Sequence, residues 1–179
     1  ILSEFVVWYS VSFACFLRAE EMAGLQWEHV QLSELAADGG HLYPKQVAIK
    51  LETSKFFVYK TMTTSVQIVM DRSSNNTICP VKAVSLLVVN RKEHLAGAVF
   101  RISTEQARKV LQILAACVSK KALKDFGLHS LRSGAACSAD EAGVNMAKIM
   151  FMGRWRSSAV LAYLRGDADG SSALLLRGK

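Results

Sequence analysis

The sequence predicts an α+β domain that is mainly α-helical and carries a small three-stranded antiparallel sheet. Two observations predict this class. Apolar residues recur at helical spacing along most of the chain, and alternating or β-branched apolar stretches fall between residues 29 and 70. The chain has 179 residues, 51% of them hydrophobic, which is enough for one domain with a sizeable core. We expect this domain to cover residues 1–166.

The first elements are predicted to be two helices. Residues 3–16 are apolar nearly all round, which is typical of a buried helix. In the next stretch, residues 17–27, apolar residues such as Met22 fit helical spacing and predict a second helix. Arg18 therefore lies at the junction of the two helices, with Glu21 one turn later.

The strands are predicted to follow. Residues 29–32 fit a short strand, whereas residues 36–44 contain Asp-Gly-Gly and a proline, which predict a loop. Residues 46–51 alternate, and residues 63–70 are β-branched and alternate too, so together they predict a hairpin or meander. Its tip falls within residues 54–61, where no Asn-Gly or Asp-Gly marks the turn, and this leaves the register open.

Helices are predicted again after residue 79. Pro80 suits the first turn of a helix over residues 80–92. Ser103 and Gln106 fit a capping box at the start of a helix over residues 104–121. The apolar residues of this second helix form a stripe at helical spacing: Ala107, Val110, Leu111, Leu114, Ala115 and Val118.

The C-terminal part is predicted to hold three short helices. Residues 130–142 and 145–152 form two of them, separated at Gly143, and residues 158–164 form the last. The tail over residues 167–179 is rich in Gly, Ser and Asp, and we expect it to be flexible.

The net charge of +7 is confined to the second part of the chain. Residues 1–100 hold 9 basic and 9 acidic side chains, whereas residues 101–179 hold 13 basic and 6 acidic ones. A one-sided basic excess suits a polyanionic partner such as nucleic acid. The alternative is a basic face that only meets solvent.

The four cysteines (Cys15, Cys79, Cys117 and Cys137) show no Cys-x-x-Cys pairing and no histidine at zinc spacing. We therefore expect no metal site and predict buried, reduced thiols, which favour an intracellular compartment.

The longest apolar run, residues 5–17, is shorter than the roughly 20 residues that span a bilayer, and it lacks a signal-peptide pattern. No membrane partner is expected. Because the chain opens with Ile1 directly in an apolar helix, we expect further sequence before it.

Residues from distant segments suit the chemistry of breaking a DNA strand without a metal. The scissile phosphate gains negative charge, and two arginines, Arg18 and Arg132, can clamp its oxygens. Tyr163 can attack, although a phenol with a pKa of about 10 needs a nearby base and cations to ionise. His129, three residues before Arg132, shares one face of a helix start with it. Lys55 can protonate the leaving 5′ oxygen.

Three blocks of sequence carry a resemblance to a known family. They are FLRAEEMAGLQWEHV (residues 16–30), HSLRSGAA (residues 129–136) and MGRWRSSAVLAYLR (residues 152–165). In this order they resemble the boxes of the catalytic domain of the tyrosine recombinase (phage integrase) family, over about residues 5–165. The resemblance implies the fold of that domain.

The resemblance also implies a set of catalytic residues: Arg18, Lys55, His129, Arg132, Trp155 and Tyr163. Glu21 matches the supporting carboxylate, and the indole of Trp155 can pack beside the phosphate. Lys55 matches the hairpin lysine of the family. Lys50 and Lys60 stay open as alternatives because the FFVYK sequence after Lys55 is apolar for a loop that lies on DNA. Ser133 stands where many members have histidine.

A second group of basic residues is interpreted as phosphate-backbone contacts or plain surface charge. It consists of Lys120, Lys121, Lys124, Arg154, Arg156 and Arg165. Trp155 and the run CPVKAVSLL look most like recombinases of eukaryotic mobile elements, the DIRS-like and Crypton groups. The implied reaction is DNA integration or excision through a 3′-phosphotyrosine, without metal or other cofactor.

The implied partners are double-stranded DNA and further copies of the chain, as a dimer or tetramer on DNA. In a eukaryotic host the implied compartment is the nucleus. The N-terminal DNA-clamping domain common in the family is absent from this chain. Two alternatives stay open: a decayed or domesticated DNA-binding domain that has lost cleavage, and a type IB topoisomerase, which relaxes supercoils without a defined site.

Overall fold

The structure is a computed structural model that describes residues 2–38, 41–51, 65–73, 79–91, 95–119, 125–155 and 159–165. It is mainly helical with small antiparallel sheets, which confirms the predicted α+β class. The predicted hairpin tip, with Lys55 and Lys60, lies outside the described residues, and so does the tail over residues 167–179.

The helices lie close to their predicted positions. They are α1 Leu2–Ala14, α2 Ala19–Ala23, α3 Pro80–Arg91, α4 Thr104–Val118, α5 His129–Glu141, α6 Met146–Gly153 and α7 Val160–Arg165. The predicted extension of α2 to residue 27 is wrong, since α2 ends at Ala23 and a 3₁₀ turn, η1, covers Trp27–His29. The backbone of Leu25 and Trp27 instead hydrogen-bonds to Val99 and Gly97, so tertiary pairing replaces the next helical turn.

The three-stranded sheet has the order β1-β4-β5 and is antiparallel throughout. Its strands are β1 Val30–Leu32, β4 Gln46–Leu51 and β5 Val66–Asp71. The central strand β4 buries Val47, Ile49 and Leu51, which confirms the alternation read from the sequence. The register pairs Gln46 at the start of β4 with Asp71 at the end of β5.

The loop predicted for residues 36–44 is wrong. The chain forms a second hairpin there, from β2 Leu35–Asp38 and β3 His41–Pro44. The Asp-Gly-Gly sequence marks a two-residue connection between strands, because Asp38 pairs directly with His41. Pro44 is tolerated because a two-stranded ribbon has only edge strands.

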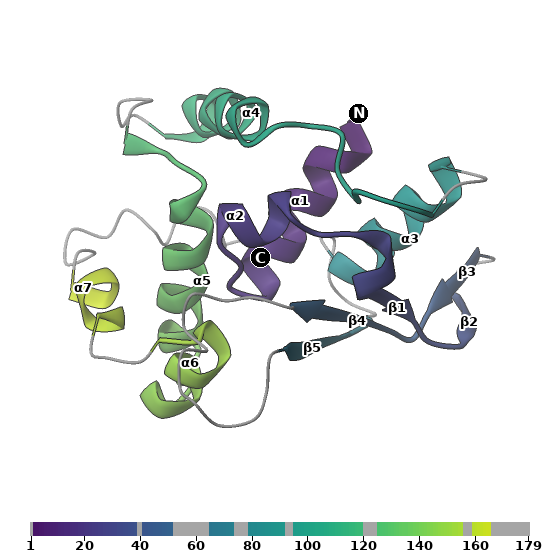
Figure 1. Cartoon of the computed structure of the whole chain (residues 1–179). Helices are drawn as coiled ribbons and strands as arrows, with labels where there is room; N and C mark the ends of the chain where they lie inside the picture. The colour runs from purple at the N-terminus through teal and green to yellow at the C-terminus, as the bar shows by residue number, and fades with distance from the viewer. Residues whose placement is uncertain are drawn as a thin grey trace.

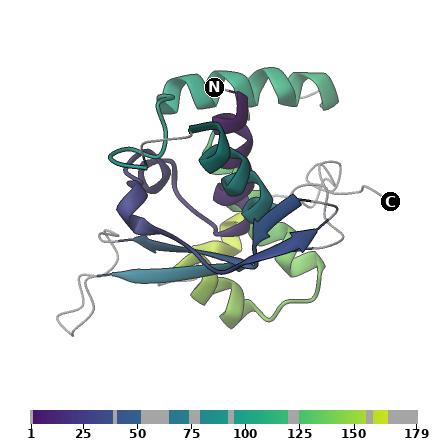
Figure 2. The same cartoon turned by 90° about the vertical axis from the view of Figure 1, so that its right-hand side faces the viewer.

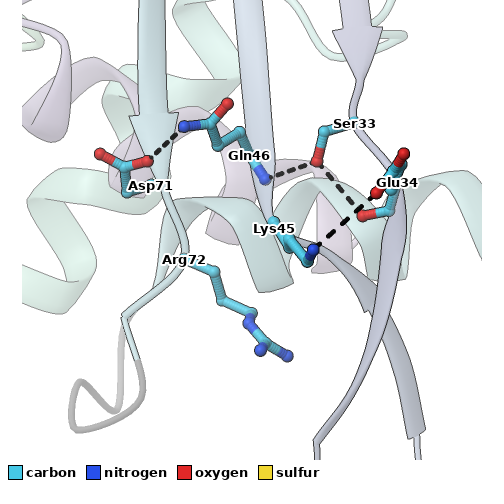
Figure 3. A pocket seen from close by; sticks show the side chains of 6 residues that line it. All are labelled: Ser33, Glu34, Lys45, Gln46, Asp71 and Arg72. Atoms are coloured by element: carbon cyan, nitrogen blue, oxygen red, sulfur yellow. Dashed lines mark hydrogen bonds and ion pairs between the residues drawn. The ribbon is translucent and has the colours of Figure 1, made fainter.

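A polar hollow of about 530 Å³ lies where the three-stranded sheet meets the β2–β3 hairpin (Figure 3). Gln46 donates its side-chain amide to Asp71 at 2.7 Å, and its backbone N–H donates to Ser33 Oγ at 2.8 Å. Lys45 lies 3.8 Å from the carboxylate of Glu34. These contacts tie the first residue of β4 to both neighbouring strands and fix the sheet register at this end.

The buried side chains form two clusters on either side of α1. The larger joins α1, α3 and the sheet through residues such as Trp8, Val84 and Ile49. The smaller joins α5, α6 and α7 and includes Ile149 and Val160. Figure 1 shows these three helices on one side of α1 and the sheet with α3 on the other. The end of α1 therefore lies between the two clusters.

The apolar stripe predicted along α4 is only partly buried. Ala107 and Ala115 are buried, but Leu114 is 51% and Val118 is 60% exposed. Figures 1 and 2 show the reason: α4 lies at the outer edge of the domain, near the N-terminal end of α1, and other elements cover only one side of it. Tyr9 of α1 donates its hydroxyl to the carbonyl of Ala107 at 2.8 Å and anchors the first part of α4.

All four cysteines are free thiols. Cys15, Cys79 and Cys137 are buried, but Cys117 is exposed on the uncovered face of α4, so the prediction of buried thiols is wrong there. Within the described ranges, no helix is long and apolar enough to cross a membrane. The same ranges contain no group of three or more His, Cys, Asp or Glu residues that could hold a metal ion.

Glu4 is a buried carboxylate near the start of α1, and replacing it is expected to destabilise the fold. It accepts hydrogen bonds from Arg91 Nη2 at 3.0 Å and from the backbone N–H groups of Arg101 and Ile102 at 2.7 and 3.2 Å. We expect Glu4→Ala to lower the free energy of unfolding by about 3–5 kcal/mol, because a buried guanidinium loses its counter-charge. Urea denaturation measures the loss.

The matched control is Glu105→Ala, which removes an exposed carboxylate from its ion pair with Arg108 on α4. Solvent screens that pair, so we expect little change in stability. Equal effects of the two substitutions would contradict the buried role of Glu4.

Candidate active site

Five of the residues singled out in the sequence meet where the end of α1 approaches α5, α6 and α7. Arg18 precedes α2, His129 and Arg132 lie in the first turn of α5, Trp155 follows α6, and Tyr163 lies on α7. Figure 1 shows α5 with α7 on one side and α1 and α2 on the other. The structure brings together positions that are far apart in the sequence, which local spacing cannot do.

Arg18 is the partly open cation of this cluster. Its side chain is 24% exposed, whereas that of Glu21 is only 7% exposed. Glu21 accepts from Arg18 Nη1 through Oε1 at 2.9 Å and from the Arg18 backbone N–H through Oε2 at 2.8 Å. The second bond caps the start of α2, as a glutamate at this helix position commonly does. The first turn of the following helix thus brings the Glu21 carboxylate against Arg18.

Arg132 is buried, with 1% of its surface exposed. Its two terminal nitrogens donate to the carbonyls of Phe16 and Gly153, and its Cζ lies 4.2 Å from the centre of the Trp155 ring. Burial, followed by the charges of Arg18 and Arg154, lowers the pKa of Arg132 to about 10. Arg132 is closed to solvent in this arrangement, and the expected phosphate clamp of Arg18 and Arg132 stays a prediction. Trp155 covers Arg132, so direct contact with a phosphate requires the indole to move.

The Gly-Arg-Trp sequence is what places the indole there. A β-carbon on Gly153 would lie 1.7 Å from Cζ3 of Trp155, so only glycine fits beneath the ring. Arg154 has φ of 56° and ends α6 in the left-handed region. The N–H groups of Arg154 and Trp155 return to the carbonyls of Phe151 and Met150, as in a Schellman motif. The chain reverses at once and lays Trp155 back over the helix end.

The end of α1 repeats this geometry with Phe16, whose φ is 54°. Among the described residues, Phe16 and Arg154 are the non-glycine residues with positive φ, and each conformation costs about 1–2 kcal/mol. The two turns contact each other, since the Phe16 ring packs edge-on against Trp155 at 5.9 Å and the Phe16 carbonyl accepts from Arg154 at 3.2 Å. Backbone strain of this kind concentrates at functional sites.

Arg154 is not the surface or phosphate-contacting residue that we expected. Its side chain is 7% exposed and donates to Glu21 Oε2 at 2.8 Å and to the carbonyls of Cys15 and Phe16 at 3.3 and 3.2 Å. A long side chain leaving a left-handed residue at the end of α6 reaches the end of α1 and is buried there. No signal in the sequence marked this role, because the partners lie more than 130 residues away.

The other expected phosphate contacts remain predictions. Lys120, Lys121, Lys124 and Arg156 lie outside the described residues, as does the expected catalytic Lys55. Arg165 is the last residue of α7, and the structure does not describe its side chain. Of the alternatives to Lys55, Lys50 lies on β4 and is exposed, and Lys60 is outside the described ranges.

His129 and Tyr163 form a direct pair. His129 Nε2 lies 2.8 Å from Tyr163 Oη, and the two rings are 5.2 Å apart. Burial, then the charges of Arg132 and Arg18, lowers the pKa of His129, which keeps its imidazole neutral at neutral pH. With its proton on Nδ1, this neutral ring accepts the hydroxyl proton through Nε2. The arrangement therefore supplies a phenol, a base in hydrogen-bond contact with it, and a nearby cation.

The effect of Arg18 on His129 can be measured directly. We expect Arg18→Gln to raise the pKa of His129 toward the ordinary value of about 6.5, because a nearby positive charge is removed. An NMR titration of the imidazole Cε1–H measures it, with the exposed Arg101→Gln as the control. An unchanged pKa in Arg18→Gln would place Arg18 too far away to act on the site.

The lowered pKa of His129 also makes the stability of the fold depend on pH. Since the pKa of His129 is lower in the folded state than in the unfolded state, the unfolded chain takes up the proton first as the pH falls. The contribution of His129 to stability is complete above the unfolded value of about 6.5 and declines below it. Arg18→Gln should make this decline smaller.

No model of a known protein family matches the chain, and no curated protein matches it. The chemistry that the site supports follows from its own side chains. Arg18 and the buried Arg132 give it positive charge, and the paired His129 and Tyr163 give it a base and an oxygen nucleophile. This combination suits nucleophilic attack on an anionic ester.

Proposed function

We propose that the chain is the catalytic domain of a tyrosine-type DNA recombinase, which breaks and rejoins DNA through a 3′-phosphotyrosine. The observation that carries this proposal is the 2.8 Å contact between His129 and Tyr163 beside Arg18 and Arg132. These residues come from three sequence blocks. The contact between Arg132 and Phe16, for example, joins positions 116 residues apart.

The first step is a transesterification at the scissile phosphate. Arg18 binds a non-bridging oxygen and offsets the charge that develops in the transition state. Tyr163 Oη attacks the phosphorus while its proton passes to His129 Nε2. The bond from phosphorus to the 5′ oxygen breaks, and that oxygen takes a proton from an acid, for which Lys55 is the expected residue. The strand is then held by a phosphotyrosine ester.

Rejoining reverses the step. A 5′ hydroxyl attacks the phosphotyrosine and returns its proton to the group that supplied it, for which Lys55 is the expected residue. The leaving Tyr163 oxygen recovers the proton held by His129. One ester replaces another in each direction, so the cycle balances without an external energy source. Arg132 supports the site from below Trp155 and reaches the phosphate itself when the indole moves aside.

The proposal is tested with a library of nicked double-stranded oligonucleotides of randomised sequence. A nick next to the cleavage point lets a short strand diffuse away and traps the covalent complex. We expect DNA binding that weakens with salt, and a denaturant-resistant adduct that a protease removes. Sequencing the trapped DNA identifies the site.

The other outcomes separate the alternatives. Binding without an adduct favours a decayed or domesticated DNA-binding domain of the same fold. Relaxation of supercoiled DNA without a preferred sequence favours a type IB topoisomerase. Assembly into dimers or tetramers on the trapped DNA, measured by mass photometry, tests the proposed homo-oligomer. The relation to mobile elements and a nuclear location in a eukaryotic host are part of the same proposal.

A further inference from the structure

We propose that Arg154 is a positioning residue, which holds Glu21 and, through it, keeps Arg18 where a phosphate binds. This assignment rests on the proposed function. Arg154 does not itself reach the substrate, since its side chain is 7% exposed and lies against the end of α1. It acts through the carboxylate that it shares with Arg18.

The backbone at this position favours a different residue. Arg154 occupies the left-handed position that ends α6, where glycine is by far the commonest choice because it has no β-carbon. In addition, Nε of Arg154 is buried without a hydrogen-bond partner among the described residues. Both features weigh against stability. Glycine would make the same turn without either cost, so the turn alone does not account for an arginine.

The contact between the Arg154 side chain and Glu21 explains why an arginine stands at this position. Each oxygen of this carboxylate binds a different guanidinium: Oε1 accepts from Arg18 Nη1 at 2.9 Å and Oε2 accepts from Arg154 Nη2 at 2.8 Å. Together with the Arg18 backbone N–H, which also donates to Oε2 at 2.8 Å, these donors hold the carboxylate in place. The Glu21 carboxylate then orients the Arg18 guanidinium, although nearly a quarter of the Arg18 side chain is open to solvent.

The charges support the same role. Without Arg154, the single charge of Glu21 faces Arg18 alone and neutralises it. With Arg154, two cations share one anion, and the group of Arg18, Glu21 and Arg154 keeps a net positive charge beside Arg132. A site for a phosphodiester needs this excess, since an arginine that is fully paired attracts an anion weakly.

The test compares Arg154→Gly, Arg154→Lys and the control Lys148→Gln, which removes an exposed charge from the same helix. Each protein is first checked for a cooperative urea transition. We expect Arg154→Gly to slow adduct formation on the nicked DNA by about 100-fold, as expected when a reacting group is displaced by about 1 Å. Its affinity for DNA should fall far less. Arg154→Lys should restore part of the rate, and Lys148→Gln should keep the wild-type rate.

A second readout does not depend on recombination. Inorganic phosphate is titrated into each protein and followed by the NMR signals of His129 and Tyr163. We expect phosphate to bind the wild-type protein and Lys148→Gln alike. Arg154→Gly should bind it about tenfold more weakly, because Glu21 then neutralises Arg18 and the site attracts the anion less. If the wild-type protein forms no adduct but this difference holds, the proposed function fails and the positioning role stands.

Three results would overturn the assignment. One is a folded Arg154→Gly protein that forms the adduct at the wild-type rate. Another is a wild-type protein that binds phosphate no better than Arg154→Gly, or not at all. A loss of rate that Arg154→Lys does not relieve, together with a noncooperative unfolding curve, would show that Arg154 only maintains the fold, and this too contradicts the positioning role.

Discussion

The Tyr163→Phe protein is expected to form no covalent adduct with nicked DNA while binding that DNA nearly as well as the wild-type protein. Only the hydroxyl oxygen is lost, and that oxygen is the proposed nucleophile. The ring stays in place because it packs against Trp155 at 5.9 Å and against His129 at 5.2 Å. Gel electrophoresis under denaturing conditions measures the adduct, and fluorescence anisotropy at fixed salt measures binding.

Tyr9→Phe is the matched control for this substitution. Tyr9 also uses its hydroxyl in a hydrogen bond, to the carbonyl of Ala107, and burial raises the pKa of Tyr9 to about 12. Losing that bond should cost about 1 kcal/mol of stability and leave adduct formation intact. An adduct that persists in Tyr163→Phe would mean that another side chain attacks the DNA, and the proposed chemistry would be wrong.

The helices were the most predictable part of the fold. The α5–α6 separation at Gly143 was expected from the sequence, and the structure gives Gly143 a φ of 76°, which glycine adopts at little cost. The capping box at Ser103 was also predicted, and both of its hydrogen bonds form. Such signals depend on neighbours within a few residues and need no knowledge of the fold.

The failures concern features that depend on distant contacts. The spacing of α4 predicts a buried stripe, but burial depends on what lies opposite, and α1 reaches only the first part of that helix. The order of the motifs in the sequence was enough to select Arg18, His129 and Tyr163 as site candidates. It gave no information on which of the site side chains are open to solvent or to a substrate. Arg132 is closed by carbonyls 116 and 21 residues away, and Arg154 is buried by partners 133 and more residues away.

Glu21→Ala is expected to lower the free energy of unfolding by about 3–5 kcal/mol, the usual cost of leaving a buried charge without its partner. Glu21 and Arg154 are each 7% exposed, so water cannot replace the lost contact. The neighbouring Glu20→Ala on the exposed face of α2 is the control and should have little effect. Urea denaturation of both proteins measures the difference.

A double-mutant cycle with Arg154→Gly separates the lost contact from other effects of Glu21→Ala. In the double variant neither Glu21 nor Arg154 is left buried without the other, so the loss should be clearly smaller than in Glu21→Ala alone. If the two substitutions add without coupling, Glu21 and Arg154 do not form a buried pair in solution. Coupling of a few kcal/mol would mean that the carboxylate is held between the ends of α1 and α6, and the position of Arg18 is then fixed by a residue 133 positions away from Glu21.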